Sequence, residues 1–502
     1  MTMTDPERIP VIIAGGQVND RPTDPDEGMD SLGLMVAALR AAETDAGIGP
    51  LLADLDSLAI VDQISFRHLG KLCEPLAAAI GANPKVNYQS DAPHGDTPIR
   101  LLNETANQIG AGEIKLAAVV GAEALRTAAG RAAKTATGED RSYSEIRKVA
   151  TRQEPNFVQA HGLIAPVDVY PLYENAGRAA YGQTLGEAQA ESAAIWSRMS
   201  EIAAANDGAW IRKPVTPEAV LASGEGNRPI AFPYNKLMVA NSSVNQGAGF
   251  IVASLAEARR RGVTEDRIIY VGMGAAAKEA GSILKRDRYD RSVSMDTSIR
   301  RTLALNQMTA ADFDFVELYS CFPCVPKMAR RTLGWPVDRP ATVFGGLTFG
   351  GGPIANYMSH AVVSMVDKLR VEGRTGFLFA NGGFATDNHC IVLSNQPIAA
   401  AQFPQDFDYQ AEADAAREAI PVLDEGHVGP AIIETYTIFY GRDGQPRAGV
   451  VVARTPDGVR TLAHVDVGDA AMVAFLTDGA IEPVGTAGEI VLGEDARRFQ
   501  KV

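Results

Sequence analysis

The sequence predicts an α/β protein made of two similar halves, followed by a small antiparallel β domain. A glycine-dense turn, a helix, a short strand and a second glycine turn follow one another between Gly345 and Gly383. The same succession runs from His94 to Gly121, and each copy spans roughly 25 to 30 residues, a normal length for an α/β unit. After Ala411 the chain changes to short β-type runs separated by Asp-Gly pairs, which are hairpin signals.

The first half alternates strand and helix patterns. Its expected elements are a strand at 10–14, a helix at 31–42, a strand at 57–61, a helix after His94 and a strand at 116–120. In the helix after His94 the apolar side chains recur at helical spacing: Ile99, Leu102, Ala106 and Ile109. This regular alternation is typical of a packed α/β body.

Residues 126–240 depart from that pattern, with a long helical stretch at 187–205, irregular Pro-containing segments and few strands. We expect an inserted lobe here. The regular pattern then resumes with a helix at 247–258 and strands at 268–271, 313–318 and 376–380, with helices at 327–332 and after the glycine turn. The last helix carries an apolar stripe formed by Val362, Met365, Val366 and Leu369.

A chain of 502 residues exceeds what one hydrophobic core usually supports. We therefore predict three parts: a first α/β half at 1–262 that includes the lobe, a second half at 263–405, and a β domain at 411–502. The turns Asp443-Gly444 and Asp457-Gly458 place hairpins inside the last part.

Composition limits the classes of partner. With 46% hydrophobic and 22% charged residues the chain reads as an ordinary globular protein. The net charge of −14 argues against nucleic acid or an anionic membrane as the main partner, so a polyanionic ligand requires a locally basic site. The chain has no apolar run of about 18 residues and no signal-like amino end, and it has only four cysteines; we expect a cytoplasmic protein without a membrane span.

Several local motifs compete for the chemistry. The run Gly272–Ala277 follows a strand and approximates a dinucleotide fingerprint, but 278–288 is too polar for the helix that should follow, so a strand-end turn is favoured. Cys321 and Cys324 have the spacing of a redox pair, and the wall of a pocket is the preferred alternative. Only His360 and His389 are conceivable partners for zinc, so no metal is expected.

Four segments together resemble the thiolase superfamily. They are Ala240–Gly249, Glu317–Phe322, Gly345–Pro353 and Asn381–Gly383, and their order and spacing match from about residue 8 to residue 400. The second segment is similar to the Glu-Leu-His-Asp-Cys-Phe motif of the sterol-carrier-protein-type thiolases. The last part resembles the extra C-terminal domain of thiolase-like proteins of type 1. The resemblance implies a duplicated, layered αβαβα fold with an inserted loop lobe and a C-terminal antiparallel β-barrel-like domain.

The family's catalytic groups map onto residues of other types. A thiolase acylates a cysteine at the start of the helix in the first repeat, and the resemblance places that position at Gly95. The activating histidine falls on Gly352, and the histidine that holds an oxyanion-binding water falls on Tyr319. The second cysteine would fall near Phe379 or Ala380. Ordinary thiolase activity is therefore not expected.

The resemblance still implies groups that could bind an acyl thioester, although the catalytic side chains are replaced. The amides of Gly382 and Gly383 could still form an oxyanion site, with Gly95 and Gly352 as pocket backbone. Ser243 matches a serine of the coenzyme A pantetheine channel; alternatively it caps a helix that begins near Val244. Asn241 and Asn245 are expected to hold turns.

Three side chains are candidates to replace the lost groups: Tyr319, His94 and Cys321. Each has a structural alternative, as a core tyrosine, a surface residue at the start of a helix and a packing residue. Tyr357 could join Tyr319, or lie on the helix surface or contact the lobe. His389 and Cys390 are expected to be structural.

Two classes of function remain open. The first is an enzyme of the acyltransferase family, similar to acetyl-CoA acetyltransferases of lipid metabolism, or a cysteine-independent retro-aldol lyase on acyl-CoA. The second is a non-catalytic acyl-CoA-binding or partner protein. In both cases the expected ligand is a coenzyme A thioester, no further cofactor is expected, and the protein is expected to be a monomer or homodimer.

Overall fold

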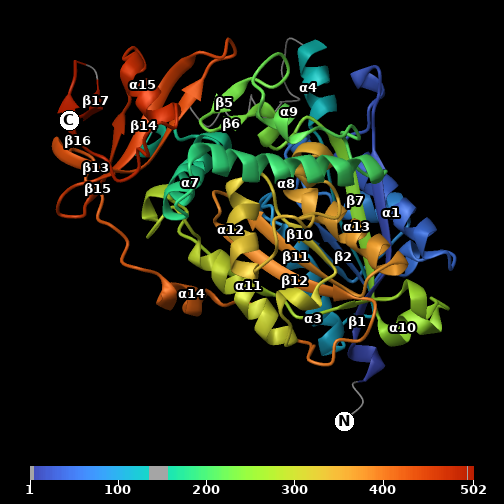
Figure 1. Cartoon of the computed structure of the whole chain (residues 1–502). Coiled ribbons are helices and arrows are strands. Elements are labelled where there is room, and N and C mark those ends of the chain that lie inside the picture. The colour runs from blue at the N-terminus through green and yellow to red at the C-terminus, as the bar shows by residue number, and fades with distance from the viewer. Residues whose placement is uncertain (1–4, 135–155, 495) are drawn as a thin grey trace.

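A computed structural model describes residues 5–134, 156–494 and 496–502. It shows an α/β body and, beside it, a separate β domain formed by the end of the chain (Figure 1). The predicted fold class is confirmed in both parts. Within the described residues, no helix is long and apolar enough to cross a membrane.

Five strands form the sheet of the first half. In spatial order they are β3 (Val86–Gln89), β2 (Ser57–Ile60), β4 (Leu116–Ala124), β7 (Asn245–Ser254) and β1 (Pro10–Asn19). The first three are parallel, whereas β7 runs antiparallel to both of its neighbours.

The second half repeats this arrangement. Its strands are β10 (Phe315–Leu318), β11 (Thr375–Gly382), β12 (Asp387–Ser394), β8 (Ile269–Val271) and β9 (Ala275–Lys278). Two parallel strands, where the first half has three, are followed by β12, which is antiparallel to all of its partners, β11, β8 and β9. The two halves join where β1 and β8 pair at Val11 and Ile12. The matching order and directions confirm the duplication that the two α/β units indicated.

Helices separate and cover the sheets. The central pair, α3 (Thr97–Ala111) and α13 (Tyr357–Val371), precedes β4 and β11. Side chains along β4 alternate in the faces they cover: Ala117 and Val119 pack in the core that contains these helices, and Ala118 and Val120 pack in the core beneath α1. The outer helices are α1 (Ser31–Ala46), α2 (Cys73–Ile80), α10 (Leu255–Arg260), α11 (Val293–Asn306) and α12 (Cys324–Leu333).

One helix prediction was wrong. Residues 245–254 form strand β7, and only 255–260 are helical. Every residue of β7 is buried, because the strand lies between β1 and β4 and is covered on both faces, so its sequence lacks the polar alternation of a half-exposed strand. No helix begins near Val244, which removes the capping role considered for Ser243.

The inserted segment forms a helical lobe over the body, and 135–155 of it lie outside the described residues. Its elements are α4 (Leu125–Lys134), α6 (Phe157–Ala160), α7 (Pro166–Ala180), α8 (Leu185–Ala205), α9 (Pro217–Leu221), β5 (Pro229–Ala231) and β6 (Tyr234–Asn235). A buried ion pair between Glu174 of α7 and Lys327 of α12, 2.5 Å apart, fastens the lobe to the second half.

The C-terminal domain is a closed barrel. After α14 (Gln410–Ala416) come β13 (Gly429–Tyr440), β14 (Pro446–Arg454), β15 (Arg460–His464), α15 (Ala470–Thr477), β16 (Ala487–Leu492) and β17 (Arg497–Lys501). Strand β13 pairs with both β14 and β16, which closes the ring through β15 and β17. Gly444 and Gly458 adopt φ of 77° and 80°, so the Asp-Gly pairs are hairpin turns as predicted.

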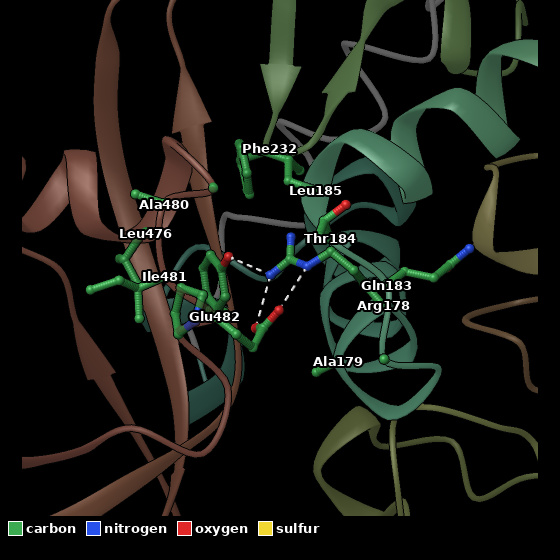
Figure 2. A pocket seen from close by; sticks show the side chains of 14 residues that line it. Arg178, Ala179, Gln183, Thr184, Leu185, Phe232, Leu476, Ala480, Ile481 and Glu482 are labelled. Carbon is green, nitrogen blue, oxygen red and sulfur yellow. Dashed lines mark hydrogen bonds and ion pairs between the residues drawn. The ribbon is translucent and has the colours of Figure 1, made fainter.

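Two arginines join the barrel to the rest of the molecule. Arg178 of α7 binds Glu482 and the hydroxyl of Tyr436 at the edge of a cavity of about 420 Å³ (Figure 2). Arg460 of β15 is fully buried; its guanidinium binds Glu434 and donates to the carbonyl oxygen of Leu284 at 2.8 Å. The barrel is thus fixed to both the lobe and the second half.

Candidate functional site

The glycine-dense loop before α13 is tightly packed. Residues Gly346–Gly350 form one turn of π-helix, and Gly345 and Gly351 adopt φ of 120° and 105°. A Cβ atom added at Gly351 would lie 2.1 Å from the amide oxygen of Gln246, whose nitrogen donates to the carbonyl of Gly350. Glycine is needed here for close backbone packing.

A buried carboxyl supports the same loop from strand β10. Glu317 accepts hydrogen bonds from the hydroxyl of Thr342, the amide of Val343 and the hydroxyl of Tyr357, the last at 2.6 Å. Burial raises the pKa of Glu317 to about 7, and burial together with Glu317 raises the pKa of Tyr357 well above its usual value. Tyr357 is therefore buried, so the surface alternative was wrong. Its ring packs edge to face against that of Tyr319, with the centroids 5.5 Å apart.

Tyr319 fills the space at the family's nucleophile position. A Cβ atom added at Gly95 would lie 2.6 Å from the Tyr319 hydroxyl oxygen and 2.2 Å from the carbonyl oxygen of Asn381. Any side chain at position 95 would therefore force its neighbours apart. Burial raises the pKa of Tyr319 well above its usual value, with smaller contributions from Cys321 and Asp96, so this phenol stays protonated and can donate a hydrogen bond.

Gly352 differs from Gly95 in the space around it. A Cβ atom there would lie 3.3 Å from the carbonyl oxygen of Asn241, which already accepts from the Gly352 amide at 2.8 Å. The side-chain oxygen of Asn241 accepts from the amide of Ser243. Asn241 thus holds a turn, as expected, and residue 352 has nearly enough room for a side chain.

Neither cysteine of the Cys321–Cys324 pair is activated. Both thiols are buried and free. Burial raises the pKa of Cys321 to about 12 and raises that of Cys324 well above its usual value. A thiol in this state is a poor nucleophile at neutral pH, so the structure favours the packing role for Cys321.

The second glycine turn lies directly beside the start of α3. Gly382 ends strand β11, and a Cβ atom on it would be 3.1 Å from the Gly95 amide nitrogen. Gly383 is exposed and has φ of 62°. Tyr170 of the lobe donates to the carbonyl oxygen of Gly383 at 3.0 Å and accepts from the amide of Ala385. Of the four glycines predicted to line the pocket, Gly95 and Gly382 therefore adjoin each other.

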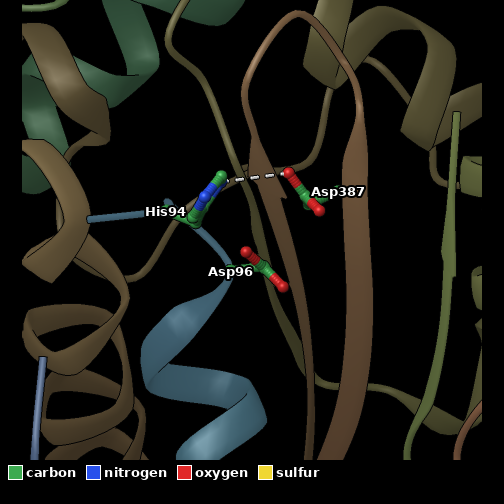
Figure 3. Close-up of side chains that lie close together, drawn as sticks. All are labelled: His94, Asp96 and Asp387. Carbon is green, nitrogen blue, oxygen red and sulfur yellow. Dashed lines mark ion pairs between the residues drawn. The ribbon is translucent and has the colours of Figure 1, made fainter. Parts of the chain in front are cut away.

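Sequence reasoning missed two carboxylates next to His94. The His94 Nδ1 atom lies 3.2 Å from Asp387 Oδ2, and Lys278 Nζ lies 3.2 Å from Asp387 Oδ1. Asp96 is buried two residues after His94 (Figure 3). The hydrogen bond with Asp387 raises the pKa of His94, and burial with the nearby Asp387 raises the pKa of Asp96 to about 6. The available signal in the sequence was that Asp96 directly follows Gly95 and that Asp387 lies four residues after Gly383.

Three arginines gather beyond Ser243. The Arg21 guanidinium lies 4.2 Å above the Trp210 ring, that of Arg126 lies 6.0 Å away, and Arg212 is within electrostatic reach of Arg21. The Arg126 amide donates to the carbonyl of Val244, and the Trp210 amide donates to the carbonyl of Gly350. This cluster, Arg21, Arg126 and Arg212 around Trp210, adjoins both the exposed Ser243 and the glycine loop.

His360 and His389 are structural. Both are fully buried, and burial lowers the pKa of each to about 3. His360 contacts Gln17, and His389 contacts Asn103. Strand β9 begins at Ala275, so the dinucleotide-like run leads into a strand and lacks the helix that binds pyrophosphate.

The comparisons agree with this geometry. A family model described as "Thiolase-like protein type 1 additional C-terminal domain" matches residues 410–495. A monomeric SCP2-thiolase-like protein type 1 from Mycobacterium smegmatis is 29% identical, with a TM-score of 0.83, covering 99% of this chain and 100% of its own. No curated protein matched the sequence.

More distant structures share the body alone. Human mitochondrial 3-ketoacyl-CoA thiolase is 14% identical with a TM-score of 0.57, and covers 78% of this chain and 100% of its own. The Ltp2–ChsH2(DUF35) aldolase is 16% identical with a TM-score of 0.58, and covers 78% of this chain and 99% of its own. The duplicated α/β body with these glycine turns has the thiolase fold. Over its whole length the chain is similar to an SCP2-thiolase-like protein of type 1, and its last part matches the additional C-terminal domain of such proteins.

Proposed function

We propose that this protein binds a coenzyme A thioester between the arginine cluster and the start of α3, and that it forms no acyl-enzyme. The observation that carries the second part is the packing of Tyr319 against Gly95, where a Cβ atom would lie 2.6 Å from the phenol oxygen. The thiol of Cys321, with its pKa raised to about 12, offers no substitute nucleophile.

The arginine cluster supports the ligand class. In a chain of net charge −14, a phosphate-bearing ligand needs a locally basic site. Arg21, Arg126 and Arg212 are exposed around one indole, and among the described residues only Asp207 forms an ion pair with any of them. Guanidinium groups suit phosphates because they donate in a planar fork. Ser243 lies between this cluster and the glycine loop, as a channel for the pantetheine arm requires.

A second candidate is cleavage of a β-hydroxyacyl thioester by a retro-aldol step. The hydroxyl of Tyr319 has no hydrogen-bond partner among the described residues, and the phenol stays protonated. In this reaction a basic group of the His94, Asp96 and Asp387 cluster takes the β-hydroxyl proton. The bond between the α and β carbons breaks, a carbonyl product leaves, and the resulting thioester enolate takes a proton from Tyr319. A protein named an aldolase shares the fold, which supports this candidate by analogy.

Calorimetric titration with coenzyme A and acetyl-CoA tests the binding proposal. We expect saturable binding by the full chain, weakened at least tenfold in Arg126→Met, whereas Arg442→Met in the exposed β13–β14 turn leaves affinity unchanged. Absence of binding by the unmodified protein would contradict the proposal.

Intact-mass measurement after incubation with acetyl-CoA tests the absence of an acyl-enzyme. We expect no mass increase. An acetyl group on Cys321 would overturn this part of the proposal and leave the binding part standing. For the lyase candidate, loss of any detected cleavage in Tyr319→Phe, with coenzyme A affinity retained, is the expected result.

A further inference from the structure

We propose that His94, Asp96 and Asp387 bind one divalent transition-metal cation. The three side chains come from two places that meet only in the fold: the start of α3 and the start of β12 (Figure 3). One ligand atom from each lies within 4.8 Å of the others. An imidazole with two carboxylates suits Zn²⁺ or Mn²⁺, because imidazole favours the later transition metals and carboxylate favours Mn²⁺.

Asp96 is the first observation that points to a ligand. Asp96 is only 6% exposed, yet its carboxylate forms no hydrogen bond or ion pair with any described residue. It occupies the N-cap position of α3, where an aspartate usually accepts from the helix amides, but no such bond is made. A buried carboxylate without a partner is costly unless a cation or proton compensates it.

The spacing is the second observation. Ligands bound at about 2.1 Å in a tetrahedral site lie about 3.4 Å from each other. His94 Nδ1 and Asp387 Oδ2 are already 3.2 Å apart. The remaining ligand distances do not exceed 4.8 Å, so a small rotation of the Asp96 carboxylate would complete a three-ligand site. Such a site leaves a position open for water or a substrate oxygen.

The net charge of the cluster and its access to solvent both allow a cation to bind. Lys278 neutralises Asp387 through the other oxygen, Oδ1, and leaves Oδ2 directed at His94. With neutral His94 the cluster of two carboxylates and one ammonium keeps a negative charge. The His94 side chain is 50% exposed, so a hydrated cation can reach it from solvent.

The position of the cation has a consequence for the chemistry, and this step alone rests on the proposed function. A Cβ atom on Gly382 would be 3.3 Å from an oxygen of Asp96. A cation bound by Asp96 therefore stands beside the amides proposed to hold the thioester oxygen, where it could polarise that carbonyl as a Lewis acid.

Metal binding is testable without coenzyme A. Chelator-treated full-length protein is titrated with Mn²⁺, followed by the electron paramagnetic resonance signal of the free ion, and with Zn²⁺ by calorimetry. We expect one equivalent to bind and the melting temperature to rise with the ion. Asp96→Asn and Asp387→Asn should each weaken binding at least tenfold. His427→Ala, a histidine of the exposed loop before β13, is the matched control and should bind as the unmodified protein does.

Two outcomes would overturn the proposed metal site. Binding weaker than millimolar by the unmodified protein, or equal affinity in Asp96→Asn, would overturn the site. Asp96→Asn removes a buried charge, so it should fold at least as stably as the parent without metal. Metal binding without coenzyme A binding would support this site and refute the proposed function. Coenzyme A binding without metal binding would support the proposed function and refute this site.

Discussion

Tyr319 packs against Gly95 and leaves no room for a side chain at that position, which limits the chemistry that the start of α3 can support. The phenol oxygen of Tyr319 lies 2.6 Å from the position that a Cβ atom of residue 95 would take. Interiors are packed too closely to admit an additional atom without displacement. The glycine at position 95 is therefore required by its neighbours, independently of any ligand.

Gly95→Ala should destabilise the protein. The added methyl group meets the Tyr319 hydroxyl and, at 2.2 Å, the backbone oxygen of Asn381, which cannot rotate away. We expect a loss of about 1–3 kcal/mol in the free energy of unfolding, measured by urea denaturation.

Gly186→Ala is the matched control. Gly186 lies in the first turn of α8, with no heavy atom within 4 Å of an added Cβ. The substitution should be neutral or stabilise by up to about 1 kcal/mol. Equal effects at the two positions would show that Tyr319 does not crowd position 95.

Glu317 should make stability fall as pH rises toward neutrality. Its pKa is about 7 in the folded protein and ordinary when unfolded, so the folded state holds the proton more tightly. This stabilisation is complete below about pH 4.5 and is lost as pH rises through about 7, a change of up to ~3 kcal/mol. Glu317→Gln should flatten unfolding free energy over this range, whereas Glu113→Gln on the surface should not.

At the scale of elements, one buried ion pair fastens the lobe to the body. Lys327 of α12 and Glu174 of α7 are each 4% exposed, and Tyr234 donates a further hydrogen bond to Glu174 at 2.9 Å. Burying both charges is expensive, but removing one partner costs more because the other is left uncompensated.

Lys327→Met should therefore destabilise by about 3–5 kcal/mol, and adding Glu174→Leu should recover part of that loss. The double-mutant cycle is measured by urea denaturation. Lys368→Met removes an exposed pair with Glu372 and should cost below about 1 kcal/mol. If the double variant is as unstable as the sum of the single ones, the pair is not coupled.

The same scale shows what the sequence could and could not predict. Helices with a regular apolar stripe, such as α3 and α13, and hairpins with Asp-Gly turns were predictable because local chemistry determines them. Strand β7 was mistaken for a helix because burial on both faces removes the polar alternation that marks a strand. In the site, Gly95 and Gly352 could be read from position, but the pairing of His94 with Asp387, 293 residues away, exists only in the fold.

At the scale of the molecule, the guanidinium of Arg460 connects the barrel to the α/β body. Arg460 is fully buried and binds Glu434 of β13 together with the carbonyl oxygens of Leu284 and Asp287 of the second half. These carbonyls have no solvent to replace the guanidinium. The domain should thus unfold together with the body.

Arg460→Met should separate the two transitions. It leaves buried carbonyls unsatisfied at the junction, so calorimetry should show an earlier transition for the barrel in place of a single cooperative one. Arg447→Met, on an exposed strand position of the barrel, should leave the profile unchanged. Two transitions already present in the unmodified protein would contradict this coupling.

The close fit of Tyr319 against Gly95 also has an evolutionary meaning. A single mutation that introduced cysteine at position 95 would be selected against for instability before any catalytic benefit arose, since the phenol and the Asn381 carbonyl already fill that space. A smaller residue at 319 alone would not make room for the thiol, because the backbone oxygen of Asn381 would still lie 2.2 Å from the added Cβ atom. A cysteine nucleophile at this place would therefore require a change at residue 319 and a shift of the backbone at the end of β11, which no single substitution supplies.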